Sequence, residues 1–187
     1  MLWDTLNATG HWDGEIWNRR KDGEIYPQRL SISCVMRGEG GVANYVAIFA
    51  DISAAKRAEE RIRHLAHHDY LTGLPNRALF VEQVGQALAL ARRYQRQLAL
   101  LFIDLDRFKP INDAYGHAVG DALLREVAGR LRGAVRKSDT VCRQGGDEFV
   151  ILLAEIEQPQ DAAVVAEKLL VALAEPQRIG EHELHVT

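Results

Sequence analysis

The first third of the chain predicts three antiparallel strands. Residues 14–20, 24–36 and 42–52 form three strand-like stretches, separated by turns at residues 21–23 and 38–41. Apolar residues occupy both faces of the third stretch, so we expect this strand to be central in its sheet or covered. Three strands by themselves form only a marginal folding unit.

A helical period follows the strands. Ala55, Ala58, Ile62 and Leu65 are spaced by three, four and three residues, with charged residues between them. This pattern predicts a charged amphipathic helix over residues 53–68. The apolar seam covers less than two heptads, so a helix packed on its own chain and a dimeric coiled coil both remain open.

Helices and strands alternate over the rest of the chain. Apolar stripes at helical spacing predict three helices, over residues 76–95, 117–135 and 161–175. We expect Asp161 to be the N-cap of the last helix and Pro176 to end it.

Two apolar stretches complete this pattern as strands. Residues 98–105 are almost continuously apolar, which is typical of a strand covered on both faces. Residues 140–144 and 147–154 flank Gly145-Gly146 and predict a hairpin with a tight two-glycine turn. The predicted fold class is therefore α+β, with a mixed or antiparallel central sheet flanked by helices.

Composition restricts the class of protein. The chain has 187 residues and a net charge of −3, which allows one domain or one domain plus part of another and argues against a nucleic-acid-coating role. Cys34 and Cys142 each lie in an apolar run without zinc-ligand spacing, so we expect small core residues in a reduced, cytoplasmic protein. No signal peptide and no stretch long enough to span a membrane occurs in the sequence.

Two acidic pairs are the candidate chemistry. Asp104-Leu105-Asp106 ends a predicted buried strand, where a carboxylate is costly unless a positive group accepts it. Asp147-Glu148 follows the glycine turn, where absent side chains let a polyanion approach the backbone. If the strand lies beside the hairpin, Asp104 and Asp147 face one site, whose oxygen ligands suit Mg²⁺ shared with substrate phosphates. The alternative, that these acids only end a strand and form a turn, stays open at this point.

Four ordered motifs resemble one family. Residues 145–149 read Gly-Gly-Asp-Glu-Phe, and segments 69–77, 102–113 and 115–121 precede them in the order found in the GGDEF family, the diguanylate cyclases. The resemblance implies a palm-like, nucleotide-cyclase-like fold. It also implies the condensation of two GTP into cyclic di-GMP and two pyrophosphates, a phosphoryl transfer that depends on positioning and charge neutralisation.

The resemblance implies the metal and catalytic residues. By their place in the motifs, Asp104, Asp147 and the carbonyl of Leu105 hold Mg²⁺ or Mn²⁺. Asp147 and Glu148 are the catalytic carboxylates, and Asp147 accepts the proton of the 3′-hydroxyl. Lys109 stabilises the charge that grows on the phosphates, although a solvated loop lysine is the alternative.

The substrate-binding residues follow from the same motifs. Asp121 can accept from both N1–H and the 2-amino group of guanine, which favours GTP over ATP, and Asn112 assists it. A helix-initiating acid is the alternative for Asp121, and a structural histidine is the alternative for His117. The full set that the resemblance implies is Phe108, Asn112, His117, Asp121, Gly145 and Gly146.

Arg136 and Asp139 match the RxxD inhibitory-site motif of the family. Arginine can grip phosphate or stack on guanine, and aspartate can pair with the guanine donors, so we expect feedback by the product. A basic residue that complements a helix end is the alternative.

The resemblance also implies the organisation of the chain. Residues 1–52 resemble the C-terminal part of a PAS sensor domain, mainly through residues 14–24; residues 53–68 are the signalling linker helix, and residues 69–187 the GGDEF domain. We expect truncation at both ends, with the family's last strand and terminal helix absent, and we assign no sensory cofactor. Each half-site holds one GTP, so we expect a homodimer. A catalytically silent GTP- or cyclic di-GMP-binding module and a dimerisation fragment are the alternatives.

Overall fold

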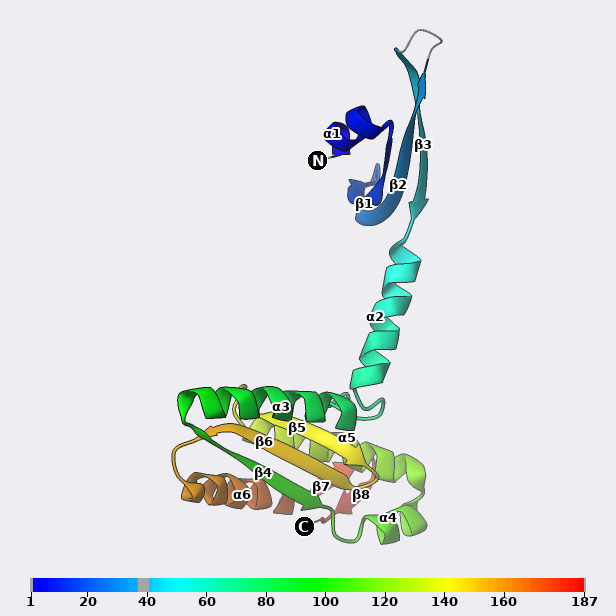
Figure 1. Cartoon of the computed structure of the whole chain (residues 1–187). Helices are drawn as coiled ribbons and strands as arrows, with labels where there is room; N and C mark the ends of the chain where they lie inside the picture. Colours follow the sequence, from blue (N-terminus) through cyan, green and yellow to red (C-terminus); the bar gives the residue numbers. More distant parts are fainter. Residues whose placement is uncertain (1, 37–40, 187) are drawn as a thin grey trace. The chain divides into compact units, whose positions relative to one another are not determined.

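The computed structural model describes residues 2–36 and 41–186 (Figure 1). These residues form two compact units, Met1–Arg63 and His64–Thr187, which are described separately. Most of the second predicted turn, at residues 38–41, falls outside the described residues.

The first unit contains the predicted three-stranded antiparallel sheet. Its strands, in the order β1-β2-β3, are β1 (His11–Arg19), β2 (Ile25–Met36) and β3 (Val42–Asp51). The first turn is closed by a hydrogen bond from the Arg20 N–H to the Glu24 carbonyl, at 2.8 Å. A short helix that the sequence analysis missed, α1 (Leu2–Thr9), buries Leu6 completely.

The expectation that the third strand is central or covered is wrong. Within residues 2–36 and 41–186, β3 pairs only with β2, and the exposed fractions of Ile48 and Phe49 are 72% and 67%. An apolar strand face becomes buried only if another layer packs on it, and none of the described elements of this unit does so for these two residues. The sequence pattern shows whether a strand face is apolar, but it does not show whether another layer packs on that face.

The amphipathic helix is confirmed as α2 (Ser53–His67). It has no buried residue, and its seam residues Ile62 and Leu65 are exposed. The choice between packing on its own chain and a coiled coil therefore stays a prediction.

The second unit is a layered α+β structure, as the sequence predicts. Its antiparallel sheet has the order β4-β6-β5, made of β4 (Gln97–Asp104), β5 (Thr140–Gly145) and β6 (Glu148–Ile156). One face carries α3 (Arg77–Tyr94), and the other carries α5 (His117–Ala134) and α6 (Pro159–Ala174) (Figure 1). The remaining elements are α4 (Phe108–Tyr115) and a small hairpin of β7 (Gln177–Ile179) and β8 (His182–Leu184).

The core lies mainly between the sheet and α5 and α6. It contains fully buried residues of both layers, among them Leu123, Val127, Leu131, Phe149 and Ile151. A smaller cluster under α3 contains Phe80, Cys142, Val150 and Leu152. Burial raises the pKa of the Cys142 thiol to about 12, so this cysteine is an inert core residue, as predicted, whereas Cys34 is only half-buried.

Two predictions about the second unit are wrong. β4 is an edge strand among the described residues, with Leu100 38% and Phe102 76% exposed, so it is not covered on both faces. Asp161 is not an N-cap: Gln158 caps α6, and the Asp161 carboxylate accepts hydrogen bonds from the N–H groups of Glu157 and Gln158 at 2.9 and 3.0 Å. An acid can cap a helix either from the N-cap position or, as Asp161 does here, from the third helical position, and the sequence pattern alone does not distinguish the two.

Membrane-spanning segments are a separate question from the fold. Among the helices formed by residues 2–36 and 41–186, none combines the length and the apolar character needed to cross a bilayer.

Candidate functional site

The β4–β6 register brings the two acidic pairs to one end of the sheet. Asp104, the last residue of β4, is the cross-strand partner of Glu148, the first residue of β6. Asp147 precedes Glu148 in the turn that joins β5 to β6. The pairing places Asp104 beside Glu148, whereas the expectation that Asp104 and Asp147 face one site stays a prediction.

The turn itself differs by one residue from the prediction. Gly145 still pairs with Glu148, so the two turn residues are Gly146 and Asp147, not the two glycines. Gly145 and Gly146 have φ angles of 148° and 55°, which favour glycine, and neither glycine has any atom within 4 Å of the place that a Cβ would occupy. The turn therefore presents bare backbone beside its carboxylates.

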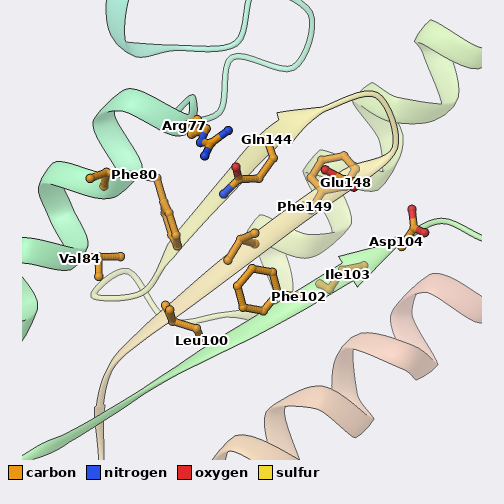
Figure 2. A pocket seen from close by; sticks show the side chains of 12 residues that line it. Arg77, Phe80, Val84, Leu100, Phe102, Ile103, Asp104, Gln144, Glu148 and Phe149 are labelled. Carbon is orange, nitrogen blue, oxygen red and sulfur yellow. The ribbon is translucent and has the colours of Figure 1, made fainter.

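A hollow of about 610 Å³ opens beside this end of the sheet, on the α3 face (Figure 2). Its polar lining includes Asp104 and Glu148, together with Arg77 and Gln144, which the sequence analysis did not select. Its apolar lining comes from α3 and the sheet, and includes Phe80, Val84, Leu100, Phe102 and Val150. Asp104 and Glu148 are exposed and thus accessible to a ligand.

The metal ligands that the motifs imply at this end, on Asp104, Leu105 and Asp147, are all oxygen atoms. Leu105 is 2% exposed, so only its backbone can act, and its carbonyl accepts a long hydrogen bond of 3.4 Å from the Phe108 N–H. Within the described part of the chain, no group of three or more His, Cys, Asp and Glu side chains is close enough to enclose a metal. Such a sparse oxygen set fits Mg²⁺ or Mn²⁺ that takes its remaining ligands from phosphates and water.

A sharp bend leads from β4 into α4. Arg107 has a φ angle of 65°, in the left-handed region, and the next residue begins the helix. Phe108 is half-buried and Lys109 is exposed. The first turn of α4 thus follows the Asp104 end of β4 after only three intervening residues.

The packing of α4 on α5 brings Asn112 against Gly120, the residue that precedes Asp121. A Cβ on Gly120 would lie 1.9 Å from the Asn112 Oδ1, so the asparagine side chain sits directly over this glycine, the residue before Asp121. Gly116, with a φ angle of 85°, joins the two helices, and its N–H donates to the Asn112 carbonyl at 2.9 Å. His117 is the exposed first residue of α5.

The RxxD residues lie at the other end of β5 from the signature turn. Arg136 is exposed, and with Lys137 and Asp139 it lines a hollow of about 440 Å³. The Asp139 carboxylate also has a local structural role, because it accepts from the Arg136 N–H at 3.0 Å and from the Ala154 N–H at 3.4 Å. The two candidate sites are therefore separate.

A buried ion pair of Asp69 and Arg143 is the main feature that sequence reasoning missed. The side chains are only 14% and 9% exposed. Asp69 opens the 69–77 motif and Arg143 stands two residues before Gly145, but the sequence analysis gave neither residue a role. The available signal was an arginine inside an apolar strand, next to Cys142, because such a charge requires a buried partner.

Comparison with known proteins identifies the family. Residues 66–187 match the family profile described as diguanylate cyclase, GGDEF domain. The bifunctional diguanylate cyclase/cyclic di-GMP phosphodiesterase MucR of Pseudomonas aeruginosa is 50% identical over 131 residues, 70% of this chain and 19% of MucR. The diguanylate cyclase TpbB of the same species is 48% identical over 120 residues, 64% of this chain and 28% of TpbB. The chain thus spans less than a third of these relatives.

Solved structures agree with the fold. The GGDEF domain of TpbB superposes with a TM-score of 0.63 at 46% identity, covering 65% of this chain and 71% of that one. The coiled coil and GGDEF domain of DgcB from Caulobacter crescentus, in complex with c-di-GMP, gives a TM-score of 0.65 at 26% identity and covers 73% of each chain. On the motifs, the fold and these matches together, the chain belongs to the GGDEF family of diguanylate cyclase domains.

Proposed function

We propose that the second unit is the output domain of a diguanylate cyclase, which condenses two GTP into cyclic di-GMP and two pyrophosphates. The observation that carries the proposal is the pairing of Asp104 with Glu148, with Asp147 in the adjoining turn. The relatives MucR and TpbB, both described as diguanylate cyclases, support it.

We assign the metal-binding and catalytic roles to the oxygen atoms at this end of the sheet. Asp104, Asp147 and the Leu105 carbonyl would hold Mg²⁺ or Mn²⁺, which supplies neutralisation of phosphate charge when bound. Asp147 accepts the proton of the attacking 3′-hydroxyl, and Glu148 supports it as the adjacent carboxylate. A bond forms between the 3′-oxygen and the α-phosphorus of the other nucleotide, the α–β anhydride bond breaks, and pyrophosphate leaves. Lys109, exposed at the start of α4, stabilises the phosphate charge.

Guanine binds between α4 and α5 in this proposal. The Asp121 carboxylate accepts from the N1–H and the 2-amino group, and Asn112, held over Gly120, adds a second contact. Adenine lacks that pair of donors, so ATP should be rejected. Phe108 and His117 close the pocket, while Gly145 and Gly146 let the phosphates approach the backbone.

Catalysis requires two copies. One half-site holds one GTP, and each 3′-hydroxyl attacks the α-phosphate of the other nucleotide, so we propose a homodimer. Arg136 and Asp139, remote from the half-site, would bind cyclic di-GMP as a feedback inhibitor. The hollow beside them and the basic side chains that line it support this role.

The first unit is proposed to be part of a PAS sensor that controls the cyclase. Its three-stranded antiparallel sheet supports this assignment. The exposed apolar residues of β3 also support it, because such a face needs a covering layer from another element or chain.

The direct test is turnover of GTP. The chain is incubated with GTP and Mg²⁺, and with ATP in parallel, and products are separated by anion-exchange chromatography. We expect cyclic di-GMP from GTP only, and a loss of roughly 10²- to 10⁴-fold in rate for Asp147→Asn, because its proton acceptor is gone. The matched control is Asp113→Asn, on the exposed side of α4, which should keep the wild-type rate.

The second candidate function is that of a silent receptor. The separate hollow at Arg136 and Asp139 favours it, since ligand binding there does not need the signature acids. Binding of cyclic di-GMP without any turnover of GTP would establish the receptor and refute the cyclase.

A further inference from the structure

The ion pair between Asp69 and Arg143 is buried, and both carboxylate oxygens of Asp69 accept hydrogen bonds. The Arg143 Nη1 donates to both carboxylate oxygens of Asp69, at 3.0 and 3.1 Å. The Thr72 N–H and hydroxyl donate to the Asp69 Oδ1 at 2.9 and 2.6 Å. Every oxygen of this carboxylate is thereby held by a donor, which fixes its orientation as well as its charge.

The other side of the same guanidinium holds the signature turn. The Arg143 Nε and Nη2 both donate to the Gly146 carbonyl, at 3.0 and 2.7 Å. That carbonyl belongs to the peptide that leads into Asp147. Gly146 has a positive φ angle and no neighbouring atom around its Cβ position, so its own packing does not restrain the peptide. Arg143 is therefore a restraint on the backbone that aims Asp147.

The loop that carries Asp69 is in turn tied to the end of α2. The Asn76 N–H donates to the His67 carbonyl at 2.9 Å, and the Asn76 side chain donates to the Ala66 carbonyl at 2.9 Å. The loop is also tied to the sheet, because the Arg143 N–H donates to the Pro75 carbonyl at 3.1 Å. The last turn of α2, Asp69 and the signature turn are thus joined by continuous hydrogen bonds within the second unit.

We infer that Asp69 and Arg143 are positioning residues of the active site: Asp69 anchors the guanidinium, and Arg143 aims Asp147 by holding the Gly146 carbonyl. The inference rests on the proposed function for its consequence in catalysis, but the restraint on the turn can be measured without it.

Two charge-conserving variants test the inference. Arg143→Lys keeps the ion pair, but one ammonium cannot hold Asp69 and the Gly146 carbonyl as the planar fork does. Asp69→Glu keeps the charge but pushes the guanidinium away by one methylene. The matched control is Arg96→Lys, in the exposed ion pair of Arg96 with Glu155.

The first measurement is amide hydrogen exchange, which needs no turnover. We expect both variants to speed exchange at residues 145–149 while the middle of β6, residues 150–153, keeps the wild-type rate, and we expect no change in the control. Wild-type exchange at the turn in both variants would overturn the inference. Faster exchange throughout the second unit would overturn it as well, because the pair would then serve stability alone.

The second measurement is steady-state kinetics with GTP. We expect kcat to fall by roughly 10- to 100-fold in both variants, as for other residues that orient a catalytic group. KM should stay within about twofold, because the guanine contacts are untouched. An unchanged kcat would overturn the inference, whereas an inactive wild type with a loosened turn in the variants would refute only the proposed cyclase.

Discussion

At the scale of single residues, the site depends on glycines, which have no side chain, and on an arginine whose guanidinium nitrogens all donate hydrogen bonds. Gly120 leaves room for Asn112, whose Oδ1 lies 1.9 Å from where a Cβ would be. Gly146 lets the turn adopt a positive φ angle, and Arg143 then holds its carbonyl. The acids carry the proposed chemistry, but glycine and arginine determine where those acids and their neighbours stand.

Replacing Gly120 by alanine should disturb guanine binding. The new Cβ would displace the Asn112 side chain, so we expect kcat/KM for GTP to fall by roughly 10- to 100-fold, mainly through KM. Gly133→Ala is the matched control on the same helix, because nothing lies within 4 Å of its Cβ position. That change should leave kinetics alone and stabilise the fold by about 0.5–1 kcal/mol. Equal kinetics for the two variants would disprove the role of Gly120.

The Asp69 carboxylate should make stability depend on acid pH. Burial raises its pKa, but the hydrogen bonds from Thr72 and the ion pair with Arg143 outweigh burial, and the net pKa is below the ordinary value. A carboxylate whose pKa is lowered by folding stabilises the folded state at any pH above its pKa in the unfolded chain, about 3.9. This contribution is lost as the pH falls through the pKa of the folded state.

The prediction compares wild type with Asp69→Asn in urea unfolding. The wild type should be more stable by roughly 3 kcal/mol from pH 7 down to about pH 5, because the variant leaves a buried guanidinium unpaired. The difference should then shrink below about pH 4. A difference that persists undiminished at about pH 3, or that already fades near pH 6, would contradict this account.

At the scale of elements, one arginine of α5 holds the connection from α6 to β7. The Arg130 guanidinium donates to the backbone carbonyls of Ala172, Glu175 and Pro176, at the end of α6 and the entry to β7. These carbonyls have no partner in a continuing helix, so a charged donor beneath them stabilises the chain reversal.

Arg130→Met should therefore destabilise the second unit. We expect the free energy of unfolding to fall by about 2 kcal/mol, since hydrogen bonds from a charged group are lost at a largely buried position. Circular dichroism in a denaturant series measures this quantity. The control Arg125→Met removes an exposed arginine of the same helix. A loss as large in the control as in Arg130→Met would show that general charge, not this contact, is responsible.

Elements were predictable where the pattern is local. Helical stripes and the glycine turn located α3, α5 and the β5–β6 hairpin within a few residues. Three of the misses share a cause: the exposure of β4, the exposure of β3 and the Asp69–Arg143 pair all depend on which segment lies opposite, and a single sequence does not specify that. The helix α4 was missed because its eight residues hold too few turns for an apolar stripe.

The candidate site was predictable to the extent that its motifs are contiguous. Asp147 and Glu148 follow from the glycine turn, and their meeting with Asp104 follows once β4 is paired with β6. The packing of Asn112 over Gly120 depends on the angle between two helices, which residue spacing does not contain.

At the scale of the whole molecule, the two units differ in how much core they have. Leu6, Gln28 and Ile32 are the buried residues among those described in the first unit, whereas the second unit buries a large cluster around α5 and the sheet. Stability follows the apolar area removed from water, so the first unit should be the weaker one.

The tryptophans allow this to be measured without engineering. Trp3, Trp12 and Trp17 are the three tryptophans of the chain and all lie in the first unit, while most helical residues lie in the second. In a urea titration we expect tryptophan fluorescence to change at a lower concentration than the far-ultraviolet circular dichroism signal. Coincident transitions would mean that the units unfold together and would refute the difference in stability.

The most direct test of the central claim is ³¹P NMR of the chain with GTP and Mg²⁺. The claim is that Asp104, Asp147 and Glu148 form a site for nucleotidyl transfer between two GTP molecules. The account predicts that GTP resonances decay while a phosphodiester signal and pyrophosphate appear together, with two pyrophosphates for each cyclic di-GMP. Release of inorganic phosphate and GDP instead, or GTP that persists unchanged, would contradict it.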